Sequence, residues 1–174
     1  MKTSKNELIE KIGDSIEIFE AIDMAIAKEY DVKAFYKSKL EQEKDPSFKN
    51  LYEFLMGEED VHVGFLEDFK ALLKSKTTAT IKEVKGFQEY IKNYTQRVPK
   101  KHFESTTPMM SEISILLAAM RVERSAEDLY TLLAEKTAEE GLKAFFNYMA
   151  DFERTHYELL DGILEEVTSF RMDT

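Results

Sequence analysis

The chain has 174 residues, 33% of them charged, with only 6 glycines, 3 prolines and no tryptophan, a composition that favours one domain of long helices over a sheet. Its formal net charge of −10 repels phosphate groups, so neither a nucleic acid nor an anionic membrane surface is an expected partner. The absence of cysteine excludes disulfides, thiolate catalysis and cysteine-bound iron–sulfur clusters.

The N-terminal segment lacks the apolar stretch of a signal peptide, and no run approaches the roughly 18 apolar residues of a membrane span. A cytoplasmic protein is therefore expected. Apolar residues recur at spacings of three and four from about Lys5 to Glu43, which predicts a first helix. Asp45 and Pro46 then suit the N-cap and first position of a second helix that extends to about Ser75.

Residues 76 to about 107 are less regular and are predicted to form a crossover. A short amphipathic helix within it is indicated by the stripe Ile81, Val84, Phe87, Ile91, Tyr94. About thirty residues can span the roughly 45 Å of a 30-residue helix, so the long helices on either side of the crossover are expected to run parallel.

The second half of the chain is predicted to repeat the helical hairpin. Thr107-Pro108 indicates the start of a third helix, which extends to about Lys136. Thr137 and Glu140 have the spacing of a capping box, which predicts a fourth helix to about Phe170. The expected fold is all-α: a single four-helix bundle over residues 1–174, made of two antiparallel hairpins joined by one long crossover.

Two Glu-x-x-His motifs lie within apolar stripes, where core residues are expected. The spacing is four, four, three, four, three and four in both of the predicted helices that carry them. The stripes are Leu51, Leu55, Glu59, His62, Leu66, Phe69, Leu73 and Phe145, Met149, Glu153, His156, Leu160, Ile163, Val167. The neighbouring Glu58 and Asp60 are off the stripe and are expected on the solvated face. A buried carboxylate needs a partner, and a bound cation is one solution.

The first and third helices carry a matching anomaly, a single glutamate in the apolar stripe. Glu29 and Glu123 occupy these positions, and Tyr36 and Tyr130 follow seven residues later on the same face. Glu20 and Glu127 are alternative carboxylates, but they lack this paired register.

The two halves superpose without a gap when the sequence is shifted by 94 residues, and the interval from lone glutamate to Glu-x-x-His motif is 30 residues in both. In each half the turn lies 15 residues from the lone glutamate and 15 residues from the glutamate of the Glu-x-x-His motif. Each interval is about 22 Å of helix, so the lone glutamate and the motif meet at one level of the bundle.

Four carboxylates and two imidazoles suit two divalent ions, either iron or manganese at one or both positions. Glu59 and Glu153 are expected to bridge the ions, with one lone glutamate and one histidine completing each position. The predicted ligands are Glu29, Glu59, His62, Glu123, Glu153 and His156. The competing interpretation is a metal-free buried polar network in a helical scaffold.

At these residues the sequence resembles the ferritin-like superfamily, and within it the rubrerythrin-related branch, over roughly residues 10–170. The resemblance implies two iron ions that react with hydrogen peroxide or dioxygen, tyrosines Tyr36 and Tyr130 beside the reacting metal, and a homodimer. Rubrerythrins also carry a cysteine-rich rubredoxin domain. This chain has no cysteine, so an external electron donor is implied.

The resemblance has one further departure, because Ala126 stands where rubrerythrins tend to have a second glutamate on the third helix. Glu127 is one residue further, about 100° round the helix. The leading hypothesis is therefore a rubrerythrin-like peroxidase, and the alternative is a ferroxidase or iron-handling protein without sustained turnover.

Overall fold

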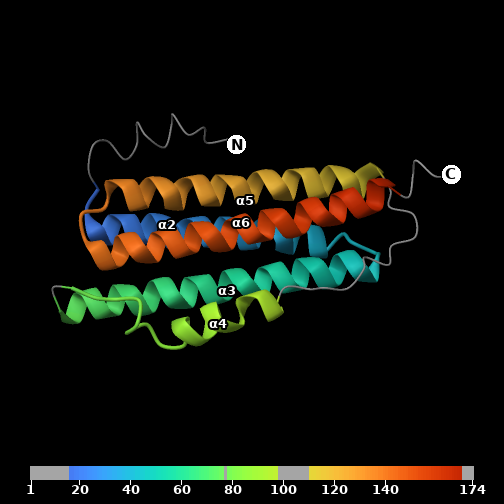
Figure 1. Ribbon diagram of the computed structural model, residues 1–174. Coiled ribbons are helices and arrows are strands. Elements are labelled where there is room, and N and C mark those ends of the chain that lie inside the picture. The colour runs from blue at the N-terminus through green and yellow to red at the C-terminus, as the bar shows by residue number, and fades with distance from the viewer. Residues whose placement is uncertain (1–15, 77, 98–109, 170–174) are drawn as a thin grey trace.

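The computed structural model describes residues 16–76, 78–97 and 110–169, and this part of the chain contains five helices and no strand (Figure 1). The helices are α2 (Ile18–Leu40), α3 (Pro46–Ser75), α4 (Phe87–Arg97), α5 (Met110–Lys136) and α6 (Glu140–Ser169). None of them combines the length and the apolarity that a membrane span requires. The predicted all-α class is confirmed.

The four long helices form a bundle of two hairpins. α2 packs along α3, α5 packs along α6, and the two hairpins meet mainly between α2 and α5. The colour gradient of Figure 1 shows α3 and α5 running in the same direction, as the crossover length predicted. The architecture is therefore that of a ferritin-like bundle.

The first helix differs from its predicted bounds. Ile16 and Glu17 are not helical and α2 ends at Leu40, so a single helix from Lys5 to Glu43 is wrong, although residues 1–15 lie outside the described part. At the C-terminal end, the Glu43 carboxylate accepts hydrogen bonds from the backbone N–H groups of the next two residues, at 2.7 and 3.0 Å. Glu43 thereby belongs to the connection rather than to the helix.

The start of α3 is as predicted, and the start of α6 is not. Asp45 caps α3 by accepting from the Ser47 N–H at 2.7 Å, with Pro46 at the first position. The capping box at Thr137 does not form, since the Thr137 hydroxyl has no hydrogen-bond partner among the described residues. Glu139 caps α6 instead, by accepting from the Leu142 N–H at 2.5 Å. The predicted cap of the third helix, Thr107-Pro108, lies outside the described residues.

A close approach of the crossover anchors the start of α6. An ideal Cβ on Gly141 would lie 1.8 Å from the carbonyl oxygen of Ala79, so only glycine lets these two backbones touch. The predicted crossover helix is shorter than expected. Residues 81–84 form a turn, and Gly86, at φ +76°, precedes the first residue of α4.

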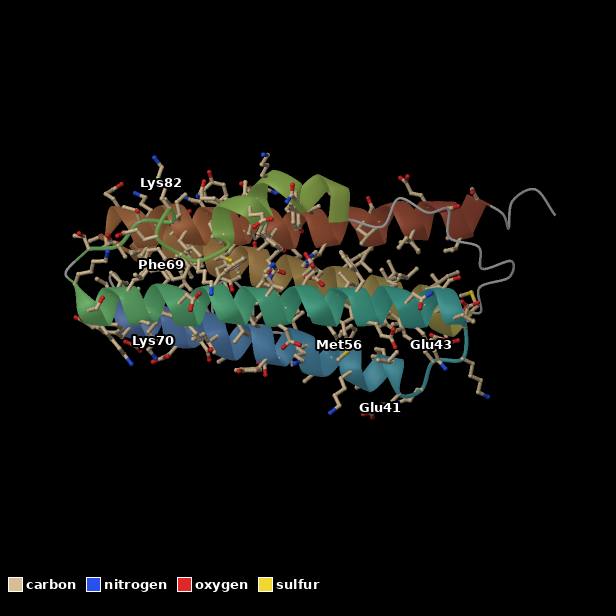
Figure 2. All side chains as sticks on the ribbon, turned by 90° about the horizontal axis from the view of Figure 1, so that it is seen from below. Glu41, Glu43, Met56, Phe69, Lys70 and Lys82 are labelled. Carbon is tan, nitrogen blue, oxygen red and sulfur yellow. The ribbon has the colours of Figure 1, made fainter. Side chains whose placement is uncertain are left out.

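Helix α4 packs against both α3 and α6, and it lies in front of α6 in the view of Figure 2. Phe87 packs against Phe65 of α3 and Phe145 of α6, with ring centroids 4.9 and 5.1 Å apart. Tyr90 and Tyr94 pack against Phe152 of α6, at 5.0 and 4.8 Å. The crossover therefore contributes aromatic side chains to the core beside the middle of the bundle.

The apolar core consists of two clusters separated by a polar layer. One contains residues such as Ala25, Phe69, Leu133 and Phe145, and Phe69 lies inside the bundle in Figure 2. The other lies toward the opposite end of the bundle and includes the buried aromatic residues Tyr36, Phe48 and Tyr52. On α2, α3 and α6 the lone glutamate or the Glu-x-x-His motif lies between the clusters in sequence, and on α5 Glu123 lies near the end of the second cluster, before Ala126.

Candidate metal centre

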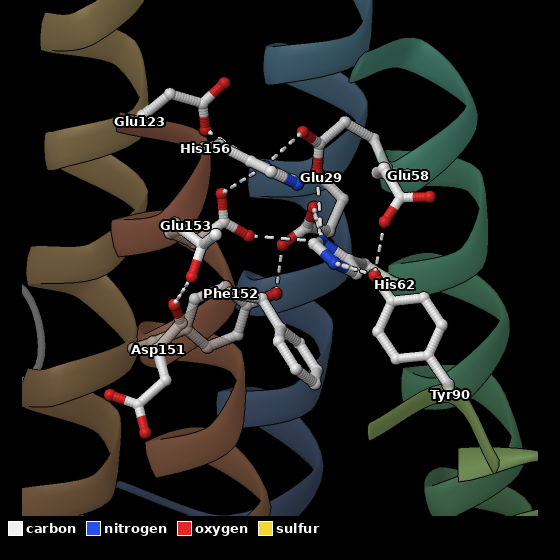
Figure 3. Close-up of polar contacts among 12 residues, drawn as sticks. Glu29, Glu58, His62, Tyr90, Glu123, Asp151, Phe152, Glu153 and His156 are labelled. Carbon is white, nitrogen blue, oxygen red and sulfur yellow. Dashed lines mark hydrogen bonds and ion pairs between the residues drawn. The ribbon is translucent and has the colours of Figure 1, made fainter. Parts of the chain in front are cut away.

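The structure brings together all six predicted ligands in the polar layer, and Figure 3 labels all of them except Glu59. Each long helix turns its polar residue, or its Glu-x-x-His pair, inward because that residue occupies a position of the apolar stripe. All six side chains are buried: five are 0% exposed and His156 is 1% exposed. The predicted ligands are Glu29 of α2, Glu59 and His62 of α3, Glu123 of α5, and Glu153 and His156 of α6.

The ligand atoms form two overlapping groups, each with atoms within 4.8 Å of one another. The group that we call the first position contains Glu29, Glu59, His62 and Glu153. The second position contains Glu59, Glu123, Glu153 and His156. Each position thus has one lone glutamate and one histidine of its own and shares Glu59 and Glu153 with the other.

Distances around the two histidines fit ligands of a common ion. His62 Nδ1 lies 3.1 Å from oxygens of Glu59 and Glu153 and 3.4 Å from Glu29 Oε2. His156 Nδ1 lies 3.5 to 3.7 Å from its three carboxylates. Neighbouring ligands that each lie about 2.1 Å from an ion are separated by roughly 3.0–3.5 Å. The first position is the more compact of the two.

The two shared glutamates each direct one oxygen to each position. Glu59 faces His62 through Oε2 and His156 through Oε1. Glu153 faces His62 through Oε1 and His156 through Oε2. This is the arrangement that a bridging carboxylate requires.

Several polar atoms in this layer lack a hydrogen-bond partner among the described residues, although buried polar groups are normally paired. These atoms are Glu29 Oε2, Glu59 Oε1, Glu123 Oε2, both oxygens of Glu153 and both ring nitrogens of His156. All are carboxylate or imidazole atoms, the donors that divalent iron and manganese accept. The residues present therefore fit a metal site.

Tyr36 and Tyr130 each donate a hydrogen bond to the lone glutamate of the opposite hairpin. The Tyr36 hydroxyl of α2 donates to Glu123 Oε1 of α5, and the Tyr130 hydroxyl of α5 donates to Glu29 Oε1 of α2. In each glutamate the other oxygen, Oε2, faces the metal position. Both tyrosines are 0% exposed and burial raises the pKa of each hydroxyl, so both remain protonated donors.

The carboxyl groups divide into two kinds by their pKa. Burial raises the pKa of Glu29, and it raises that of Glu123 to about 8. Burial also acts to raise the pKa of Glu59 and Glu153, but the two histidines outweigh it and hold these pKa values below the usual range. Without metal, burial and the histidines therefore favour the ionised form of the shared glutamates and the protonated form of the lone glutamates.

In the metal-free site both histidines favour the positively charged imidazolium form. Burial acts to lower the pKa of His62 and His156, but neighbouring tyrosine oxygens and three carboxylates around each ring raise it well above its ordinary value. Two imidazolium ions then balance two carboxylates. Two divalent ions would likewise balance four carboxylates, so metal loading exchanges protons for metal ions at constant site charge.

We expect loading with two divalent ions at pH 7 to release about four protons per chain, two from Glu29 and Glu123 and two from the imidazoles. For the same reason the metal affinity should rise from pH 6 to pH 8. Calorimetric titration in two buffers of different ionisation enthalpy measures the proton count. The variant His102→Gln, which changes the histidine outside both motifs, serves as the control. A release near zero would contradict this assignment of charges.

Sequence reasoning placed two nearby residues wrongly or not at all. Glu58, expected on the solvated face, is only 2% exposed, whereas Asp60 is exposed and pairs with Lys33. Tyr90 of α4 donates to Glu58 Oε2 at 2.6 Å and lies 3.3 Å from His62 Nε2. Tyr90 was not part of the apolar stripe predicted for the crossover helix. Its spacing of three residues from Phe87 and four from Tyr94 could have indicated that it faces the bundle.

The position of Glu127 agrees with its exclusion from the predicted ligand set. Its side chain is 10% exposed and pairs with Arg124 and, at 2.9 Å, with the Nε of Arg154. It belongs to neither metal position. Ala126, three residues after Glu123, is fully buried and offers no ligand atom.

The comparison with known families covers the second hairpin. The family model Rubrerythrin matches residues 114–171, which include Glu123, Glu153 and His156. No curated protein and no solved structure gives a significant match to the chain. The correspondence of the first hairpin rests on the 94-residue repeat and on the geometry of the site. The α5–α6 hairpin is thus similar to rubrerythrins, in agreement with the resemblance that the sequence indicated.

Proposed function

We propose that this chain is a non-haem di-iron oxidoreductase that reduces hydrogen peroxide, or dioxygen, with electrons from an external donor. The observation that carries the proposal is the pair of buried positions that share Glu59 and Glu153. The rubrerythrin match of the second hairpin supports it. Four carboxylates and two imidazoles suit iron or manganese, and iron is the metal that serves peroxide reduction in the resembling family.

The protein residues hold and insulate such a centre. Bound iron would supply two electrons to the O–O bond of the oxidant. Glu59 and Glu153 offer one oxygen to each position, so they hold both ions in one unit. Tyr36 and Tyr130 orient Glu123 and Glu29 by hydrogen bonds. Because burial keeps these hydroxyls protonated, we assign Tyr36 and Tyr130 the catalytic role of donating hydrogen bonds to the two lone glutamates beside the reacting metal.

An anaerobic Fe²⁺ titration of chelator-treated protein, followed by one pulse of hydrogen peroxide, tests the proposal. Saturation at about two ions per chain is expected, because two positions are present. One peroxide should then oxidise both ions, since H₂O₂ takes up two electrons and two protons to give two waters. The His102→Gln variant should behave like wild type. Absence of tight binding, or binding of a single ion, would overturn the di-iron proposal.

Ala126 favours a second candidate, a ferroxidase or iron-handling protein. A glutamate at this position would add a carboxylate to the Glu123 side of the site, and the buried alanine cannot. Repeated peroxide additions with a chemical reductant separate the candidates. Many peroxides consumed per chain support the peroxidase, whereas oxidation that stops after one turnover and releases ferric iron supports the alternative.

A further inference from the structure

The crossover helix α4 places one side chain directly against a predicted ligand. The Tyr90 hydroxyl donates to Glu58 Oε2 at 2.6 Å and lies 3.3 Å from His62 Nε2. Phe65 and Phe152 pack edge-on against the Tyr90 ring, with centroids 5.2 and 5.0 Å away, and the side chain is only 4% exposed. The aromatic packing therefore fixes the Tyr90 ring, and the contacts with Glu58 and His62 that Figure 3 draws fix its hydroxyl.

This contact determines which nitrogen of His62 is available to a metal ion. Because the Tyr90 proton is given to Glu58, the Tyr90 oxygen accepts the hydrogen of His62 Nε2. When metal loading removes the Nδ1 proton, Nδ1 carries the lone pair, and it faces the oxygens of all three carboxylates of the first position. Metal-bound histidines usually donate their second N–H to such a partner, which fixes the ring and strengthens the ligand.

The second position has no such support in the described part of the chain. His156 Nε2 has no hydrogen-bond partner there. The 94-residue shift aligns Glu58 with Phe152, which has no side-chain acceptor. Tyr94, one turn after Tyr90, donates to the backbone carbonyl of Phe152 at 3.3 Å rather than to His156. The six predicted ligands are thus pseudo-symmetric, but the residues that contact the two histidines are not.

We propose that Tyr90 is a positioning residue for the first position, and that through its hydrogen bonds to Glu58 and His62 it makes this position bind a divalent ion before the second. The inference rests on the proposed metal pair. Its physical basis is the difference between a histidine with an oriented, hydrogen-bonded ring and one without. Loss of such an outer partner typically weakens metal binding about 10- to 100-fold.

Zn²⁺ titration followed by ¹⁵N NMR of the imidazoles tests which position fills first. Zn²⁺ is diamagnetic and binds the same donor atoms. In wild type we expect the His62 signals to shift with the first equivalent and those of His156 with the second, with a slowly exchanging Nε2 proton on His62 alone. In Tyr90→Phe the first binding step should weaken by about 10- to 100-fold, and both histidines should shift together.

Tyr94→Phe is the matched control, since it removes a buried hydroxyl from the same helix without touching His62. It should retain the wild-type order of filling. The inference is overturned if Tyr90→Phe keeps that order, if both steps weaken equally, or if His156 fills first in wild type. The wild-type NMR signals decide the question even if the variant folds poorly. If wild-type protein bound no Zn²⁺, Fe²⁺ or Mn²⁺, that result would instead contradict the proposed two-metal site itself.

Discussion

Replacing Glu59 by glutamine is expected to prevent binding of a pair of metal ions and to slow peroxide consumption by about 100-fold or more. Glu59 directs one oxygen to each position, so its loss removes a ligand from both. A change in the layer around a metal already costs about 10- to 100-fold, and a shared direct ligand should cost at least as much. Glutamine keeps the shape of the side chain, which limits the effect on packing.

Two measurements test this expectation. Metal content per chain should fall below two after an Fe²⁺ titration, and the initial rate of peroxide loss with an external reductant should fall in parallel. Glu53→Gln is the control, because Glu53 is exposed on the same helix. A Glu59→Gln variant that binds two ions and consumes peroxide at the wild-type rate would show that the site is not the catalyst.

The helical bundle was predictable because each long helix carries an apolar stripe with few interruptions. The ends were less predictable, since side chains compete for the same backbone donors. Thr137 and Glu140 have the spacing of a capping box, yet the Glu139 carboxylate takes the donor at the start of α6. The contact of Gly141 with Ala79 constrains that end of α6, and local sequence patterns carry no information about such a tertiary contact.

The position of the candidate ligands was predictable for a different reason. A glutamate or histidine in an apolar stripe is costly unless it has a partner, so its inward direction follows from helix periodicity alone. Glu58 shows the limit of this argument. It is off the stripe of α3, and it is buried because α4 covers that face and supplies Tyr90 as a partner. Contacts made by the crossover depend on its path, which periodicity does not determine.

Loading with Mn²⁺, or with Fe²⁺ under anaerobic conditions, is expected to raise the midpoint of thermal unfolding by roughly 15–30 °C over protein in chelator. At a free-ion concentration of 1,000 times Kd, each ion adds about 4.1 kcal/mol to the free energy of unfolding, and for a chain of this size one kcal/mol moves Tm by about 2–4 °C. Calorimetry at several metal concentrations measures the shift. A Tm that responds neither to metal nor to chelator would favour the metal-free scaffold.

The size of this shift should also depend on pH, and its sign follows from the pKa values of the metal-free site. The raised pKa values of Glu29, Glu123, His62 and His156 stabilise the metal-free fold below the ordinary pKa of each group. That stabilisation is lost as pH rises through the folded-state pKa, which for Glu123 is about 8. Bound metal needs the deprotonated ligands. The difference in Tm between loaded and chelated protein should therefore widen from pH 6 to pH 9, because only the chelated form depends on these protons. A constant difference would mean that the buried groups do not hold protons at neutral pH.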